Sequence, residues 1–220
     1  MTRLVKGMVL AHRGAWSSAL EPNSVAALKS AAEKGFGIET DFRDRLGSIV
    51  VSHDVALERH PLLSEVLGAL SSSHFKGVLA LNVKADGLVT TLGLFRQELK
   101  QVDHFFFDMS IPETLKYSSA NLVIAERRSE YETGPSLKFP KASSKTRWID
   151  SFHLDWWLDI DSSTLVPTGS RAFFVSPELH GRDPSNAWRR LRELVESGIS
   201  VGVCTDFPDD YWAFIGGKDG

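Results

Sequence analysis

The sequence predicts an α/β protein, a small (β/α)₈ barrel of the TIM type. Short apolar strands alternate with amphipathic helices along the chain, which is typical of parallel βαβ units. If the return strand of one hairpin is left out, about eight such strands remain, the number in a TIM barrel. Polar residues stand where these strands end, and barrel active sites are built at the carboxyl ends of strands. No repeat or domain boundary is evident, so one domain is expected over residues 1–220.

Two periodicities place the individual elements. Apolar runs bounded by turn residues predict strands at 8–11, 38–42, 49–51, 77–81, 104–107, 122–125, 148–152, 172–175 and 199–203. Apolar residues at helical spacing predict helices at 25–32, 62–70, 88–99, 112–118 and 184–197. Asn23 or Ser24 can cap the first helix, and Arg45-Leu46-Gly47-Ser48 predicts a hairpin turn. The polar segment 127–145, which holds two prolines, predicts a mobile surface loop.

Composition limits the function classes. The 220 residues are 42% hydrophobic and carry a net charge of −3 with both signs interspersed, so we expect no nucleic-acid partner. The single cysteine, Cys204, excludes an internal disulfide and a thiolate zinc site. No run approaches the roughly 20 apolar residues of a membrane span, and the first apolar run is too short for a signal peptide. We therefore expect a cytoplasmic protein without integral membrane association.

Four residues near the N-terminus indicate chemistry. His12 and His53 each follow a short apolar strand, and Glu39 and Asp41 lie two residues apart within another strand. Because successive side chains of a strand point to opposite faces, both carboxylates emerge on the same face. Two histidines and a carboxylate pair suit hydrolysis assisted by a hard divalent cation. The alternative is structural: the carboxylates could pair with nearby arginines, and an isolated histidine is more often structural than catalytic.

Several short motifs then resemble the glycerophosphodiester phosphodiesterase family, in order and at similar spacing. The strong part comprises His12-Arg13-Gly14, Glu21-Pro22-Asn23-Ser24, Glu39-Thr40-Asp41 and Ser52-His53-Asp54. Leu81-Asn82-Val83-Lys84 is similar to the third-strand motif of the family, and Thr205-Asp206-Phe207-Pro208 to its closing signature. Each motif alone is weak, but the ordered set is specific. The venom phospholipase D-type toxins share this layout of histidines and carboxylates.

The resemblance implies a TIM-type barrel that hydrolyses a glycerophosphodiester to glycerol phosphate and an alcohol, with one divalent cation, Mg²⁺ or Ca²⁺. Carried over by position, His12 and His53 are the acid/base pair, and Arg13 and Lys84 bind the substrate phosphate. The metal ligands are Glu39, Asp41 and Asn82. Histidine suits both roles, because one ring can be neutral and another protonated near pH 7. We assign His12 as the base and His53 as the acid, and the two roles could be exchanged. A neighbouring substrate hydroxyl could attack first and give a cyclic phosphate.

Two departures from the family pattern bear on this expectation. The family has a glutamate where this chain has Asn82, so one anionic ligand is replaced by an amide oxygen and metal affinity should be lower. Glu178 or Asp108 could supply the lost carboxylate. The family also usually has a long insertion after its second histidine, whereas only residues 54–76 precede the next predicted strand here. We therefore expect an open mouth to the site.

Two other functions stay open at this stage. The open mouth favours a phospholipase D-like lipid or polymer phosphodiesterase, as would Trp156 and Trp157 if they lined it. For these two tryptophans, however, packing under a loop is the favoured interpretation. Asn82 favours a degenerate barrel that binds phosphorylated ligands without turnover. In each case the substrate or ligand is a small-molecule or lipid-derived phosphate compound. His153 and His180 lie near predicted strand ends and are candidates for substrate contact.

Overall fold

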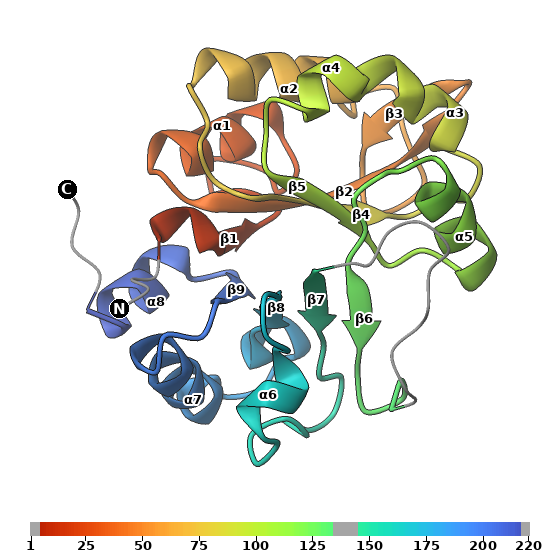
Figure 1. The fold of residues 1–220 in the computed structure, drawn as a ribbon. Coiled ribbons are helices and arrows are strands. Elements are labelled where there is room, and N and C mark those ends of the chain that lie inside the picture. Colours follow the sequence, from red (N-terminus) through yellow and green to blue (C-terminus); the bar gives the residue numbers. More distant parts are fainter. Residues whose placement is uncertain (1–4, 134–144, 217–220) are drawn as a thin grey trace.

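The computed structural model describes residues 5–133 and 145–216, which form a parallel barrel (Figure 1). Within these residues the strands follow the order β5-β4-β2-β1-β9-β8-β7-β6, and every neighbouring pair in it is parallel. The bounds are β1 Val9–His12, β2 Gly37–Arg45, β4 Leu79–Val83, β5 His104–Phe107, β6 Glu126–Arg128, β7 Thr146–Ile149, β8 Arg171–Val175 and β9 Val201–Thr205. The remaining strand, β3 Ser48–Val51, pairs antiparallel with β2 outside this order.

The two ends of the strand order meet at a narrow joint between β5 and β6. Phe106 of β5 forms a single parallel bridge with Ile124, just before β6. Its amide donates to Val123 O, and its carbonyl accepts from Ala125 N, both over 2.8 Å. The joint closes the barrel, so the predicted (β/α)₈ fold is confirmed.

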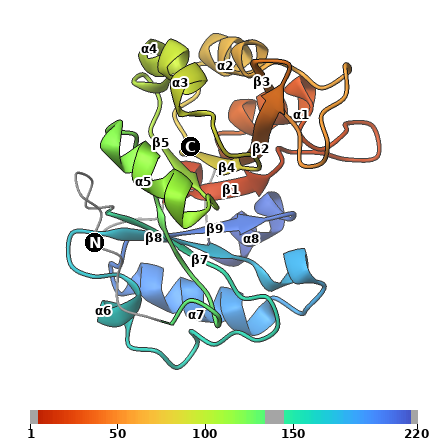
Figure 2. The same ribbon diagram turned by 90° about the vertical axis from the view of Figure 1, so that its right-hand side faces the viewer.

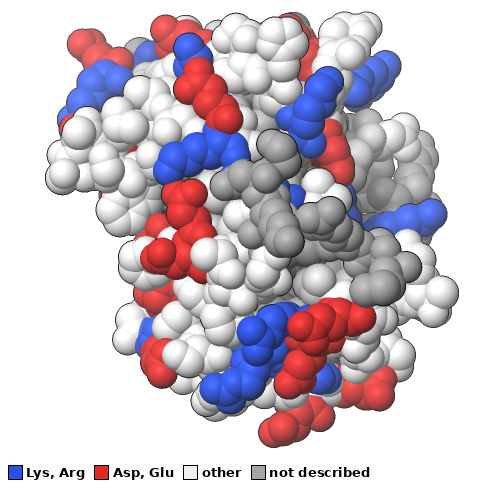
Figure 3. All heavy atoms as spheres, turned by 90° about the vertical axis from the view of Figure 1, so that its left-hand side faces the viewer, with Lys and Arg blue, Asp and Glu red and all other residues white. Residues whose placement is uncertain are grey.

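Helices cover the outside of the barrel. In Figure 1, α1 to α4 lie on one side of the strands and α6 to α8 on the other, and Figure 2 shows the same arrangement from a second direction. The bounds are α1 Val25–Glu33, α2 Leu63–Ser72, α3 Val89–Leu92, α4 Arg96–Leu99, α5 Ile111–Ser119, α6 Ser162–Leu165, α7 Ser185–Glu196 and α8 Pro208–Phe214. Among the described residues, no helix is long and apolar enough to cross a bilayer. Lys, Arg, Asp and Glu side chains intermingle on the face shown in Figure 3.

The buried apolar side chains form two separate layers. The inner cluster fills the barrel and includes Leu10, Ala80, Phe105 and Trp148. The outer cluster packs the other face of the same strands against the helices. Since side chains alternate along a strand, the residues that follow the inner cluster by two positions point into the mouth of the barrel. This alternation positions the polar residues described below.

The hairpin of β2 and β3 is as predicted. Leu46 and Gly47 have positive φ values of 48° and 82°, the conformation that a two-residue type I′ turn requires, and Arg45 is the register partner of Ser48. β3 returns antiparallel beside β2 and leads the chain to His53. His53 therefore reaches the barrel mouth from an added strand, outside the ring of eight.

Two sequence predictions are wrong in detail. The strand predicted at 122–125 lies further along as β6, Glu126–Arg128, so the predicted loop 127–145 begins inside a strand. The two arginines of β6 are typical of a loop, so the sequence did not indicate a strand there. In the structure, Arg127 forms ion pairs with Asp108 and Glu132, which allows a charged residue in this strand. Residues 134–144 of that loop lie outside the described part. The helix predicted at 88–99 is divided by a 3₁₀ turn, η2 Gly93–Phe95. Trp156 and Trp157 pack in the outer core, as the favoured interpretation of the sequence has it, and neither lines the mouth.

Candidate active site

A cavity of about 270 Å³ opens at the carboxyl ends of the barrel strands. Its walls continue the inner face of the barrel: His12 follows Leu10 by two residues, and Asn82 follows Ala80. The cavity is lined by every residue that the sequence predicts for catalysis, phosphate binding or metal binding, namely His12, Arg13, Glu39, Asp41, His53, Asn82 and Lys84. The structure therefore brings the predicted site residues together, whatever role each has.

The strand register places the carboxylates. Glu39 is the register partner of His12 on β1, and Asp41 is the partner of Asn82 on β4. Both carboxylates lie on the inner face of β2, as their spacing predicts, and both are buried. They do not pair with Arg43 and Arg45; the Arg45 side chain instead donates to carbonyls of the 57–60 loop. The pairing with these two arginines, which was the alternative to a metal site, is therefore not formed.

The turn after β1 requires a glycine at position 14, because its backbone is left-handed there and packs directly against α1. Arg13 and Gly14 have positive φ values of 57° and 89°. A Cβ on Gly14 would lie 2.6 Å from the backbone of Ala27 in α1, a clash that any other residue would meet. The Arg13 amide donates to Glu39 O over 2.9 Å, and its carbonyl accepts from Asn23 N over 2.9 Å. The His-Arg-Gly motif thus joins β1, β2 and the loop before α1.

Asn23 reaches from that loop to Asp41. Its side-chain amide donates to Asp41 Oδ2 over 2.9 Å, and its amide oxygen accepts from Thr40 Oγ1 over 2.7 Å. The cap of α1 is Ser24, whose hydroxyl accepts from Ala27 N over 3.1 Å. The predicted capping role therefore falls to Ser24, and Asn23 belongs to the site.

His12 is held by an aspartate from the far end of the chain. Its Nδ1 donates to Asp206 Oδ1 over 2.7 Å, which leaves Nε2, 3.9 Å from Glu39 Oε2, to accept a proton. Burial acts to lower the pKa of His12, but the hydrogen bond to Asp206 and the charges of Glu39 and Asp206 outweigh it and raise the pKa above 6.5. In the sequence, Asp206 stands out only as part of the closing signature Thr205-Asp206-Phe207-Pro208. The structure makes it the partner of His12.

One carboxylate oxygen of Glu39 receives no hydrogen bond from the part of the chain that the structure describes. Burial and the neighbouring charge of Asp41 raise the pKa of Glu39 from 4.5 to about 7, against the pull of His12, Lys84 and Arg13. Its Oε2 and the Oδ1 of Asn82 are both buried, and neither has a hydrogen-bond partner within residues 5–133 and 145–216. Unpaired buried acceptors beside a second carboxylate fit a hard cation. No three His, Cys, Asp or Glu side chains in the described ranges converge on a metal position, so an ion here would depend on the Asn82 oxygen.

Arg13 and Lys84 meet at the remaining carboxylate. Arg13 Nε lies 3.1 Å from Asp41 Oδ2, and Lys84 Nζ lies 3.4 Å from Asp41 Oδ1. Lys84 also lies 3.8 Å from Asp108, which pairs with Arg127. Asp108 thus lines the cavity with its charge compensated. Glu178 lies outside the lining and accepts hydrogen bonds from Thr205 and Ser176.

Two further histidines at the cavity also have aspartate partners. His53 Nδ1 donates to the exposed Asp54 over 2.9 Å, and the His53 side chain is 42% exposed, twice the 21% of His12. His180 donates from Nε2 to Asp150 Oδ1 over 2.9 Å. Sequence reasoning placed His180 near a strand end but gave no signal for Asp150, because the pair joins separate loops.

Comparison with known proteins identifies the fold. No protein-family model and no curated protein matches the chain. A solved glycerophosphodiester phosphodiesterase from Agrobacterium tumefaciens is 18% identical with a TM-score of 0.67, covering 97% of this chain and all of that one. The corresponding enzyme from Parabacteroides distasonis is 13% identical with a TM-score of 0.67, covering 98% and 87%.

A third solved structure is a phosphodiesterase from Oleispira antarctica in complex with the product sn-glycerol-3-phosphate. It is 16% identical with a TM-score of 0.61 and covers 94% of this chain and 96% of that chain. All three alignments span almost the whole barrel at low identity. The chain therefore has the barrel fold found in solved glycerophosphodiester phosphodiesterases.

Proposed function

We propose that the protein is a metal-dependent phosphodiesterase that hydrolyses a glycerophosphodiester to glycerol phosphate and an alcohol. The observation that carries this proposal is the composition of one cavity. It is lined by His12, which Asp206 holds, by a second histidine and by two cations. Glu39 and Asn82 add two buried oxygens that have no hydrogen-bond partner among the described residues. Diester hydrolysis needs these elements: a base, an acid, positive charge for the phosphoryl oxygens and a site for a cation.

His12 is the proposed base. Its Nδ1 is engaged by Asp206, so Nε2 is the nitrogen that accepts a proton from the attacking water or hydroxyl. The carboxylates of Asp206 and Glu39 then stabilise the imidazolium that results. This is the same effect that raises the pKa of His12 in the free protein.

His53 is the proposed acid that protonates the leaving oxygen. The Asp54 carboxylate orients its ring through Nδ1, and the greater exposure of His53 suits a group that meets an entering substrate. A positioned acid matters because an alkoxide is a poor leaving group; such proton transfers contribute typically 10²–10⁴-fold in rate.

Arg13 and Lys84 are proposed to bind the phosphate. Both cations are partly exposed and approach Asp41 from opposite oxygens, so they are held at the cavity before substrate arrives. A phosphate at this position would share them with Asp41. Glu39, Asp41 and Asn82 would hold the cation, Mg²⁺ or Ca²⁺. When bound, the cation supplies positive charge to the non-bridging phosphate oxygens.

The comparisons support the glycerophosphodiester as the substrate class. Two structures of the same fold are glycerophosphodiester phosphodiesterases, and the third holds sn-glycerol-3-phosphate. This support is at the level of the fold. The residues of the cavity supply the rest of the argument.

The first experiment measures turnover of bis(p-nitrophenyl) phosphate and glycerophosphocholine, in metal-stripped protein and after addition of Mg²⁺, Ca²⁺ or Mn²⁺. We expect metal-dependent release that falls by at least about 10²-fold in His12→Ala and His53→Ala. His104→Ala, at the opposite end of the barrel on β5, serves as the matched control and should retain activity.

Each other outcome has a meaning. Full activity in His12→Ala or His53→Ala would remove that residue from the acid/base pair. Turnover of a lysophospholipid but not of glycerophosphocholine would favour the lipid phosphodiesterase. Binding of glycerol phosphate by folded protein that turns over no diester would identify a binding module.

A further inference from the structure

A second, shallower hollow of about 560 Å³ adjoins the active-site cavity. It is lined by Tyr131, Phe152, His153 and His180. Phe152 and His180 also line the active-site cavity, so the two spaces share a wall. A substituent on a phosphate bound in the cavity can therefore reach the aromatic hollow.

The rings of the aromatic hollow are inclined to one another. Tyr131 and Phe152 have centroids 6.1 Å apart at 47°, and Tyr131 and His153 are 6.0 Å apart at 84°. Phe152 and His180 are 5.3 Å apart at 57°. Rings inclined in this way form a concave surface. A planar ligand would instead stack on a single flat face. The hollow thus suits a compact, rounded group.

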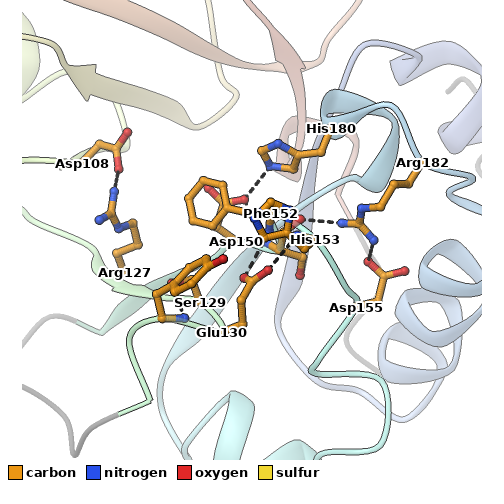
Figure 4. A network of polar contacts seen from close by, with 12 residues as sticks. Asp108, Arg127, Ser129, Glu130, Asp150, Phe152, His153, Asp155, His180 and Arg182 are labelled. Carbon is orange, nitrogen blue, oxygen red and sulfur yellow. Dashed lines mark hydrogen bonds and ion pairs between the residues drawn. The ribbon is translucent and has the colours of Figure 1, made fainter.

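Negative charge lies next to these rings: Figure 4 shows Glu130 beside the Phe152–His153 segment and Asp150 beside His180. Glu130 accepts from Phe152 N over 3.1 Å and from His153 N over 2.7 Å, so the carboxylate fixes the segment that carries both rings. Burial acts to raise the pKa of Glu130, but these backbone donors lower it below 4.5 and keep the group anionic. Asp150 accepts a hydrogen bond from His180. A nearby guanidinium, that of Arg182, pairs with Asp155.

We propose that the aromatic hollow binds a quaternary ammonium group on the alcohol substituent of the diester. Ring faces attract a cation within about 6 Å of their centroids, and a trimethylammonium group matches both the rounded shape and the negative surroundings. The inference rests on the proposed function, since it places the phosphate in the adjoining cavity. It makes choline esters the preferred substrates within the glycerophosphodiester class.

A hollow on the other side of the cavity leaves room for the second substituent. This space, about 510 Å³, shares Arg13 and His53 with the cavity and is bordered by Glu21 and Arg59. Its polar border suits the hydroxyl groups of glycerol. The two arms of a glycerophosphocholine molecule thus meet different chemistry on either side of the phosphate.

The test compares glycerophosphocholine with its neutral isostere, the glycerophosphate ester of 3,3-dimethyl-1-butanol, which replaces nitrogen by carbon. We expect the choline ester to have a KM roughly tenfold lower, as contacts with two or three rings imply. In Tyr131→Leu this ratio should fall severalfold because one ring is lost, whereas Tyr131→Phe keeps the ring and should keep the ratio. Leu154→Ala changes an exposed neighbour that does not line the hollow and is the control with unchanged kinetics.

A wild-type ratio near one, or an unchanged ratio in Tyr131→Leu, would overturn the proposal. If neither ester is hydrolysed, the proposed function fails and the hollow is tested by binding. Choline should shift the ring NMR signals of His153 and His180 in wild type more than 3,3-dimethyl-1-butanol does. In Tyr131→Leu a higher choline concentration should be needed for the same shifts. Equal shifts for both alcohols would overturn the ammonium site independently of catalysis.

Discussion

Asn23 donates its side-chain amide to Asp41 Oδ2 over 2.9 Å while its own amide oxygen accepts from Thr40. One loop residue thereby satisfies a buried carboxylate and the hydroxyl of its neighbour on β2. Asn23 itself has a positive φ of 62°, a conformation that asparagine tolerates better than most residues. The Glu-Pro-Asn-Ser motif is therefore part of the site as well as the start of α1.

Asn23→Ala should lower stability and activity together. It removes one of two partners of Asp41 Oδ2, which keeps Arg13, and leaves the buried Thr40 hydroxyl without its acceptor. The expected cost is roughly 1–3 kcal/mol, to which alanine at a positive φ adds strain. Asn23→Gly removes the same hydrogen bonds without the backbone strain, so its smaller loss isolates their contribution. Urea unfolding and turnover measure both. Wild-type behaviour in Asn23→Gly would contradict a role for the Asn23 side chain.

Asp206→Asn should lower the pKa of His12, because it removes the anion whose hydrogen bond and charge raise it. A base must be unprotonated to act, so the acidic limb of kcat/KM against pH should move to lower pH. The maximal rate should fall by roughly 10²-fold as the imidazole loses its orientation. Asp209→Asn, an exposed carboxylate that pairs with Lys34, is the matched control. A limb that stays in place would show that another group sets it.

Glu39→Gln should stabilise the metal-free protein at high pH. The pKa of Glu39 is raised to about 7 in the folded state from an ordinary 4.5, so folding favours the protonated form. The stability that this group contributes is present below pH 4.5 and is lost as pH rises through 7. At pH 8 the variant should be more stable by up to about 3 kcal/mol.

Chemical unfolding at pH 4.5 and pH 8 measures this difference, which should shrink at the lower pH. Added Mg²⁺ or Ca²⁺ should stabilise wild type at pH 8 more than the variant, since it would compensate the buried charge. A difference that is equal at both pH values would mean that Glu39 is not the group that titrates.

Asn82→Glu should reduce the metal concentration needed for half-maximal activity. The Asn82 oxygen is buried and unpaired beside Asp41, and a carboxylate there adds the charge that a hard cation prefers. Asn82→Gln has the same length as glutamate without the charge and should not tighten the metal. Identical metal titrations for wild type and Asn82→Glu would place the ion elsewhere.

The sequence is most informative where neighbours in the chain are also neighbours in the site. Strand alternation placed Glu39 and Asp41 on one face, and the hairpin turn placed His53 beyond its return strand. Each of these inferences depends on a few consecutive residues whose geometry is set by local backbone rules.

Local backbone rules do not predict which distant residues hydrogen-bond to the site histidines. Asp206 is 194 residues from His12, and only closure of the barrel brings β9 beside β1. Asp150 and His180 meet across two loops whose course no periodicity encodes. β6 was misplaced because its arginines look like loop residues until Asp108 and Glu132 are seen to pair with Arg127.

The narrow joint between β5 and β6 has fewer strand-to-strand hydrogen bonds than the rest of the barrel wall and is its weakest part. In the described part of the chain, the other neighbouring strands share three to five register partners, whereas this joint has the one bridge of Phe106 and Ile124. An ion pair between Asp108 and Arg127 connects the two strands across this joint at the mouth of the barrel. Thermal opening should begin there, where the fewest hydrogen bonds must break. The joint of β1 and β9 lies diametrically opposite, so the barrel can widen beside Asp108 while His12 and Asp206 keep their alignment.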